Sequence, residues 1–253
     1  MRNSLKDLVV ANWNLERPFP SSEKSKTLEE FFDSNSADIW FLTETHEQIL
    51  PDKDFYSIFS ENPDRKSQEG ERWVGVWSRW EIEPLSELVT DKSRCTAGLI
   101  NDSEFGPIVI YGVVLPWNSD PRIKGSTSFK VFDDAILNVE ADLVKISELH
   151  PKVPIILAGD FNQSLASKHY YGSNAKRERL EKFLAHMGLV VLTSGSNDPV
   201  FRDSYPNACI DHICLSSSSG FNLVSTSRWP EAPSLKGAPS DHYQINVRLT
   251  HEI

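Results

Sequence analysis

The chain has 253 residues, of which 39% are hydrophobic and 25% charged, a composition typical of a globular protein. Its 36 acidic residues outnumber its 26 basic residues, which gives a formal net charge of −10. Because affinity for duplex nucleic acid rests largely on basic contacts to phosphates, this balance disfavours tight, sequence-independent duplex binding. The chain lacks a signal-peptide pattern, an apolar run of membrane-spanning length and any CxxC pair. We therefore expect a cytoplasmic protein without a membrane span or a disulfide framework.

Apolar runs that predict buried strands recur along the whole chain. They cover residues 8–15, 38–43, 73–78, 108–115, 153–158, 189–192, 210–215, 221–226 and 243–249. Near-continuous apolar runs of this length are typical of strands that are covered on both faces. The polar segments between them, at 61–71, 117–128, 163–175 and 229–240, are interpreted as long loops, because a strand pattern resumes after each.

Helical spacing of apolar residues appears three times. The first helix is predicted to begin at a capping box over residues 27–30, the second spans 129–149, and the third runs over 180–187 and ends at Gly188. A strand–helix–strand pattern at 9–43 has a faint echo at 155–192, which suggests a duplicated unit. We expect a single mixed α/β domain over residues 1–253.

Polar residues stand where these strand patterns end or begin. They are Asn14, Glu16, Glu44, Asp160, Asn162, Asp211, Asp241 and His242. Each alone fits a turn or a helix terminus, but strand ends are also where α/β proteins build their sites. Asp211 is harder to explain as a turn residue, since a carboxylate flanked by Ile210 and Ile213 is costly unless it is paired. The repetition indicates one functional site.

Five short motifs, taken in order, resemble those of the endonuclease/exonuclease/phosphatase superfamily. They are Asn-Trp-Asn-Leu-Glu at 12–16, Leu-Thr-Glu-Thr at 42–45, Gly-Asp-Phe-Asn at 159–162, Ile-Asp-His-Ile at 210–213 and Ser-Asp-His at 240–242. The superfamily includes exonuclease III-type abasic-site endonucleases, DNase I, neutral sphingomyelinases and inositol polyphosphate 5-phosphatases. The resemblance covers about residues 8–250. It implies a DNase I-like fold, an α/β four-layer sandwich of two mixed β-sheets packed face to face with helices outside.

The resemblance also implies a Mg²⁺-dependent phosphoesterase, with Mn²⁺ as a substitute metal. Phosphate esters resist attack because their oxygens are anionic, so a catalyst must neutralise charge and position a water. Mg²⁺ prefers oxygen ligands and needs few protein groups. Glu44 is the first ligand expected, Asn14 and Asp241 complete or support the site, and Glu16 is expected to reach the metal through water.

Four further residues are implied to act on the substrate. Asp160 aligns or deprotonates the attacking water, and Asn162 steadies that water or a phosphate oxygen. Asp211 orients His242, whose imidazolium binds a phosphoryl oxygen. The sequence leaves open whether Asp160 or His242 is the general base. His212 is expected to face away from the site, because neighbouring residues of a strand point to opposite faces.

The loop after residue 116 carries the substrate-binding candidates. Members of the superfamily commonly have a Tyr or His at the end of the preceding strand, and this chain lacks one. Trp117, Asn118, Arg122 and Lys124 offer an aromatic ring, an amide and two cations, the groups that hold a single strand or nucleotide, although a solvated loop is the simpler interpretation. Trp229 is a second stacking candidate.

Two enzymatic functions remain open from the sequence. The first is a nuclease-type phosphodiesterase acting on single-stranded or damaged nucleic acid, and the second is a phosphatase or phosphodiesterase acting on a small-molecule or lipid-headgroup phosphate. A third interpretation, a binding module without activity, is disfavoured because the other catalytic positions are filled. The sequence indicates no protein partner.

Overall fold

The structure of the chain is a computed structural model that describes residues 7–63, 67–166, 171–201, 207–232 and 234–251. Its helices are α1 (Glu23–Ser34), α2 (Ser128–Leu149) and α3 (Asn174–His186), with 3₁₀ turns at Ser86–Leu88, Pro121–Ile123 and Gly195–Asn197. Its strands are β1 (Asp7–Asn14), β2 (Ile39–His46), β3 (Tyr56–Phe59), β4 (Glu71–Ser78), β5 (Glu83–Pro84), β6 (Cys95–Ile100), β7 (Ile108–Val114), β8 (Ile155–Asp160), β9 (Leu189–Val191), β10 (Asp211–Ser216), β11 (Phe221–Trp229) and β12 (Gln244–His251).

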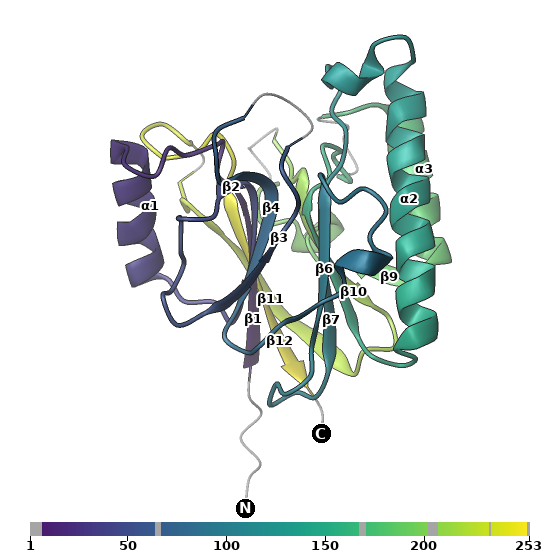
Figure 1. The fold of residues 1–253 in the computed structure, drawn as a ribbon, viewed down its shortest axis with the longest axis horizontal. Helices are drawn as coiled ribbons and strands as arrows, with labels where there is room; N and C mark the ends of the chain where they lie inside the picture. Colours follow the sequence, from purple (N-terminus) through teal and green to yellow (C-terminus); the bar gives the residue numbers. More distant parts are fainter. Residues whose placement is uncertain (1–6, 64–66, 167–170, 202–206, 233, 252–253) are drawn as a thin grey trace, which may run out of the picture.

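The strands form two mixed six-stranded sheets. Their orders are β11-β12-β1-β2-β4-β3 and β5-β6-β7-β8-β10-β9. Figure 1 shows α1 against the outer face of the first sheet, and α2 with α3 against the outer face of the second. The predicted α/β sandwich is confirmed. None of the described helices combines the length and apolar character needed to cross a membrane.

Three apolar layers hold the sandwich together, and strand alternation assigns residues to them. In β1, Leu8 and Val10 belong to the core between the two sheets, whereas Ala11 and Trp13 pack with the residues of α1. A third cluster lies between the second sheet and the helices α2 and α3. Because both faces of the central strands are covered, these strands read as continuous apolar runs.

Helix α1 begins a full turn before the predicted start. Ser22 is its N-cap, and the side chain of Ser22 accepts a hydrogen bond from the backbone N–H of Ser25. Thr27, the residue expected to cap the helix, lies inside it and donates its hydroxyl to the carbonyl of Glu23 at 3.1 Å. The capping-box prediction was wrong because Thr27 bonds back along an existing turn.

Strand β6 was missed because its small residues carry a weak strand pattern. One of these small residues, Gly98, is required by close packing. A Cβ atom at this position would lie 2.3 Å from the side chain of Ile82. The suggested internal repeat was also placed wrongly. The adjacent parallel pairs are β1 with β2 and β7 with β8, whereas β10 separates β8 from β9.

Candidate active site

The polar residues at the strand ends contact one another across the two sheets. The strand end of β1 that carries Asn14 lies on the side of the sandwich away from the chain termini (Figure 1). Alternation explains the convergence. In β8, Asp160 continues the inner face formed by Ile156 and Ala158, and in β10 Asp211 continues that of Ile213 and Leu215. Asp160 and Asp211 are direct partners in the antiparallel ladder, so two carboxylates lie side by side on one face, an arrangement that is destabilising unless positive charge compensates it.

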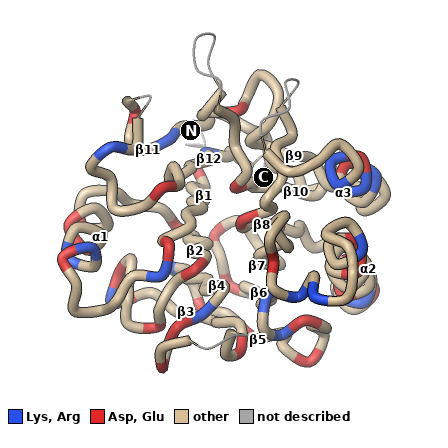
Figure 2. The backbone as a smooth tube through the Cα atoms, turned by 90° about the horizontal axis from the view of Figure 1, so that it is seen from above, with Lys and Arg blue, Asp and Glu red and all other residues tan. Residues whose placement is uncertain are grey.

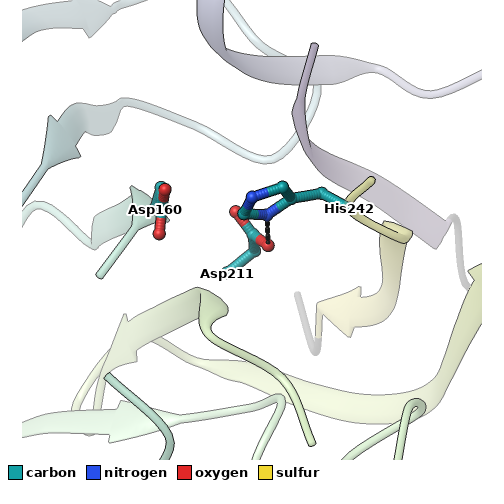
Figure 3. Close-up of side chains that lie close together, drawn as sticks. All are labelled: Asp160, Asp211 and His242. Carbon is teal, nitrogen blue, oxygen red and sulfur yellow. Dashed lines mark hydrogen bonds and ion pairs between the residues drawn. The ribbon is translucent and has the colours of Figure 1, made fainter. Parts of the chain in front are cut away.

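Asp211 and His242 form an ion pair that joins the two halves of the site. His242 Nδ1 lies 2.6 Å from Asp211 Oδ2, and Figure 3 shows this contact with Asp160 nearby. Burial disfavours the imidazolium, but the charge and hydrogen bond of Asp211 outweigh it and raise the pKa of His242 to about 10. His242 is therefore a cation at neutral pH.

Asp160 is almost fully buried and is held by two donors. Its Oδ1 accepts from the backbone N–H of Asn162 at 2.8 Å, and its Oδ2 accepts from Asn14 Nδ2 at 3.1 Å. Burial, followed by the charge of Asp211, raises the pKa of Asp160 to about 7. Asn162 has a left-handed backbone with φ of 49°, and its Nδ2 donates to the carbonyl of Leu115 at 3.0 Å.

Asn14 and Glu44 form the neighbouring part of the site. Asn14 Nδ2 also lies 3.4 Å from Glu44 Oε1, so its amide stands between Glu44 and Asp160. Glu44 does not follow the end of its strand as predicted, since β2 continues to His46. In the pairing of β2 with β4, Thr43 and Thr45 have partners among the described residues but Glu44 does not, and the φ of Glu44 is 45°. This local break lets a residue inside a strand depart from the alternation of its neighbours.

The two other predicted metal ligands are less centrally placed. The side chain of Glu16 is 48% exposed and pairs with Lys24 at 2.9 Å. Its backbone N–H donates to Asn14 Oδ1 at 2.8 Å, so Glu16 helps to orient Asn14. The Asp241 side chain is 71% exposed, and its Oδ1 lies 3.7 Å from His242 Nε2. Asp241 is thus at the mouth of the site.

The site has the chemistry of a divalent-cation site. Ligand atoms of Asp160, Asp211 and His242 lie within 4.8 Å of one another, and Asn14 Nδ2 links Asp160 Oδ2 to Glu44 Oε1 beside them. Asp211 Oδ1 is buried and has no hydrogen-bond partner in the described part of the chain. Clustered carboxylates, one of which has a buried oxygen without a hydrogen-bond partner among the described residues, suit a hard cation that prefers oxygen ligands.

The loop residues proposed to bind substrate are largely engaged with the protein. The Trp117 ring lies 5.7 Å from the Trp73 ring and 5.0 Å from the guanidinium of Arg94. Arg122 pairs with Asp91 at 2.9 Å. Two of the predicted residues, Asn118 and Lys124, are exposed.

Two of the substrate-binding candidates, Asn118 and Trp229, make further contacts within the protein. Asn118 Oδ1 accepts from Lys176 Nζ at 3.0 Å, so its amide is oriented by the protein although it is exposed. Trp229, the second stacking candidate, packs instead against Trp13 and Phe31, with ring centroids 5.6 and 4.5 Å away.

His212 points away from the site, as alternation predicts. Its ring is buried, with Nδ1 at 3.1 Å from Thr193 Oγ1 and Nε2 at 3.2 Å from the carbonyl of Gln163. Burial lowers the pKa of His212. This histidine supports the structure behind Asp211 and does not enter the site.

Three residues at the site received no role from the sequence. Ser240 donates its hydroxyl to the carbonyl of Asn14 at 2.6 Å and accepts from the N–H of His242. Asn12 donates from the first sheet to carbonyls of the second, and Arg17 pairs with Glu44 at 2.7 Å. Asn12 could have been noticed because it shares the inner face of its strand with Asn14. No pattern distinguished Arg17.

A hollow with a volume of about 240 Å³ adjoins the Asp211–His242 pair. Among the described residues, both polar and apolar side chains line it, including Asn162, Val200, Ala208, Ile210, Leu235 and Tyr243. It provides space for part of a molecule whose reacting group lies at His242.

A sequence model of the endonuclease/exonuclease/phosphatase family matches residues 11–242. The chain belongs to this family. As a member of the endonuclease/exonuclease/phosphatase family, it is a hydrolase of phosphate ester bonds, and its buried acidic cluster is a group able to hold a metal ion. A comparison with curated proteins found no match.

Solved structures with the same fold include an endonuclease, an exonuclease and a protein complexed with single-strand DNA. The AP endonuclease LMAP from Leishmania major superposes with a TM-score of 0.70 at 14% identity, over 98% of this chain and 89% of that chain. The 3'-5' exonuclease NExo from Neisseria meningitidis gives 0.64 at 16% identity, over 95% and 98%. TDP2 from D. rerio, complexed with a single-strand DNA product, gives 0.65 at 16% identity, over 96% and 99%. At these identities the likeness shows the fold.

Proposed function

We propose that the protein is a Mg²⁺-dependent phosphodiesterase that acts on nucleic acid. The observation that carries the proposal is the pairing of a cationic His242 with Asp211, directly beside the buried carboxylate of Asp160 and the Asn14–Glu44 pair. This arrangement combines an electrophilic group, a proton acceptor and oxygen ligands within one strand-end cluster.

Glu44 and Asn14 are the residues that would hold the metal, with Asp241 at the mouth and Glu16 acting through Asn14 or a water. A bound Mg²⁺ would neutralise charge on the phosphate oxygens. The proposed ligand set differs from the tightest cluster of ligand atoms, which contains Asp160, Asp211 and His242. We favour Glu44 over His242 as the ligand because His242 is a cation and Mg²⁺ prefers oxygen.

The chain's own groups account for the proton movements of hydrolysis. Asp160, with its pKa of about 7, is suited to take a proton from water near neutral pH. The water oxygen then forms a bond to phosphorus while the bond to the leaving oxygen breaks, and the leaving oxygen takes up a proton from solvent. His242, held charged by Asp211, donates a hydrogen bond to a phosphoryl oxygen and stabilises its growing charge. We therefore propose Asp160 as the general base.

Two observations support a strand of nucleic acid as the substrate, and a third bears on the kind of strand. The hollow beside His242, at about 240 Å³, is smaller than the roughly 300–1,000 Å³ of usual small-ligand pockets, so it suits one unit of a longer molecule. TDP2 from D. rerio, which shares the fold, is complexed with a single-strand DNA product. In Figure 2 the helices carry mixed acidic and basic positions and none is basic throughout, which agrees with a single strand or a damaged site more than with tight duplex binding.

The second candidate is a small-molecule or lipid-headgroup phosphate ester, and the net charge of −10 favours it. Hydrolysis assays with abasic DNA, single-stranded DNA, RNA and phosphate mono- and diesters, in Mg²⁺ or Mn²⁺ and with a chelator, decide between the two. We expect metal-dependent cleavage of a nucleic acid.

Variants connect that activity to the site. His242→Ala and Asp160→Asn should each lower kcat by about 10²-fold or more, while Glu47→Gln, at a surface ion pair with Arg72, should match the parent. Turnover that survives chelation would contradict the metal, and cleavage of monoesters alone would establish the second candidate.

A further inference from the structure

Two contacts tie Arg17 to Glu44. Glu16, Arg17 and Glu44 have φ of 52°, 54° and 45°, a left-handed conformation that is unfavourable for residues other than glycine. The N–H of Arg17 donates to the carbonyl of Glu44 at 2.8 Å, and Arg17 Nε lies 2.7 Å from Glu44 Oε2. Backbone and side chain thus hold Arg17 at the one carboxylate that we expect to bind metal first.

The two oxygens of Glu44 have different surroundings. Oε2 is buried and faces Arg17. Oε1 lies 3.4 Å from Asn14 Nδ2, which also donates to Asp160 Oδ2, so Oε1 is directed toward the buried acidic cluster. A carboxylate otherwise turns broadly about its last torsion angle. A cation fixed on one oxygen therefore directs the other oxygen toward Asp160.

We propose that Arg17 is a positioning residue for the metal ligand Glu44: it holds Oε2 and thereby presents Oε1 to the metal. This inference rests on the proposed function, because it requires Glu44 to bind the metal. The opposing possibility is that Arg17 is a counter-ion that the metal displaces. The two roles have opposite effects on metal affinity. Partners that orient a metal ligand increase the affinity by about 10- to 100-fold, whereas a competing cation decreases it.

The direction of the change in metal affinity tests the inference without reference to activity. Calorimetric titration with Mn²⁺ should give about tenfold weaker binding for Arg17→Met than for the parent, since Met keeps the length but loses the donor. Lys24→Met is the matched control, because it removes a nearby cation, at the start of α1, that pairs with Glu16 and not with Glu44. Its Mn²⁺ affinity should equal or slightly exceed that of the parent. Equal or tighter Mn²⁺ binding by Arg17→Met would overturn the role of Arg17.

Glu44→Gln separates this failure from failure of the proposed function. If Glu44→Gln binds Mn²⁺ as tightly as the parent, the metal site itself is wrong. If that variant loses binding while Arg17→Met does not, only the positioning role is wrong.

A measurement on the parent protein avoids any loss of folding in the variants. The ¹⁵Nε chemical shift of Arg17, followed by ¹H–¹⁵N NMR during titration with Mg²⁺, should stay near its metal-free value at saturation, because the ion pair with Oε2 persists. A change on Mg²⁺ binding to the chemical shift of an unpaired arginine would show displacement and overturn the proposal.

Discussion

Asp160 and His242 have pKa values shifted upward for different reasons. For Asp160 the main cause is burial, which disfavours the charged carboxylate, and the neighbouring Asp211 adds to it. For His242 burial acts in the opposite direction, and the charge of Asp211 outweighs it. One carboxylate thus helps to keep a proton on both groups, since Asp211 lies opposite Asp160 in the ladder and bonds to His242.

The raised pKa of Asp160 predicts a pH-dependent cost to stability in the metal-free protein. The folded chain keeps the Asp160 proton up to about pH 7, whereas the unfolded chain releases it near the ordinary value of 3.8. Between these limits the folded state binds more protons, so the parent loses stability as pH rises. Asn at this position does not titrate. From pH 4 to pH 8 the free energy of unfolding of Asp160→Asn should therefore rise relative to the parent by about 1–3 kcal/mol.

Denaturant unfolding of both proteins in chelator across this range measures that difference. Comparing slopes with pH removes the constant effect of placing an amide opposite the Asn14 amide. Parallel stability curves would contradict the burial of an ionisable Asp160.

Residue identities at the site could be predicted from sequence, but backbone conformations could not. Asp160, Asp211 and His242 were expected to act together, and the structure brings them together. Glu44 was expected after the end of its strand, yet it lies inside β2 with a positive φ. Sequence patterns give no sign of such a break, because it depends on contacts with the 15–17 segment, including the bond from Arg17 to the Glu44 carbonyl.

At the scale of elements, the loop after β7 is anchored by a buried ion pair. Arg94 and Asp120 are 3.0 Å apart, with side chains 2% and 0% exposed. The Arg94 guanidinium also lies 4.2 Å from the Trp73 ring and 5.0 Å from that of Trp117. The charged and aromatic side chains of this loop thus hold it against the sheets. The sequence pattern could not have predicted this role, because it does not show which distant residues pair.

Removing Arg94 should therefore cost much more stability than removing a surface arginine. Arg94→Ala leaves Asp120 buried with less compensation and should lower the free energy of unfolding by about 2–5 kcal/mol. The matched control is Arg248→Ala, whose ion pair with Asp7 has the same 3.0 Å separation but a 53% exposed arginine. Its expected cost is below about 1 kcal/mol. Equal losses in denaturant unfolding would show that burial of the Arg94 pair is not decisive.

On the scale of the whole molecule, the site belongs to neither sheet alone. Asn14 and Glu44 come from the first sheet and Asp160 and Asp211 from the second, while His242 lies just before β12 of the first. Apolar runs predicted most of these strands, yet strand pairing is non-local and cannot be read from periodicity. Only the resemblance of ordered motifs implied that two sheets would face each other, and the repeat inferred from the local patterns was assigned to the wrong strands.

Asn12 provides a direct test of how the two sheets are aligned. It is fully buried on β1, and its Nδ2 donates across to the carbonyls of Gly159 at 2.9 Å and His212 at 3.3 Å. These carbonyls flank Asp160 and Asp211 in the chain. Asn12→Leu should lower the free energy of unfolding by about 1–3 kcal/mol, because buried carbonyls lose their partner.

The same substitution should also reduce catalysis. A small shift between the sheets misplaces groups on both sides of the substrate, so kcat should fall by about tenfold or more. Asn246→Leu is the control, since Asn246 lies in the same sheet but its side chain, among the described residues, bonds only to the side chain of Gln244 in its own strand. It should lose stability while retaining kcat. If Asn12→Leu is destabilised and still turns over like the parent, apolar packing alone aligns the sheets and the Asn12 bridge is dispensable for catalysis.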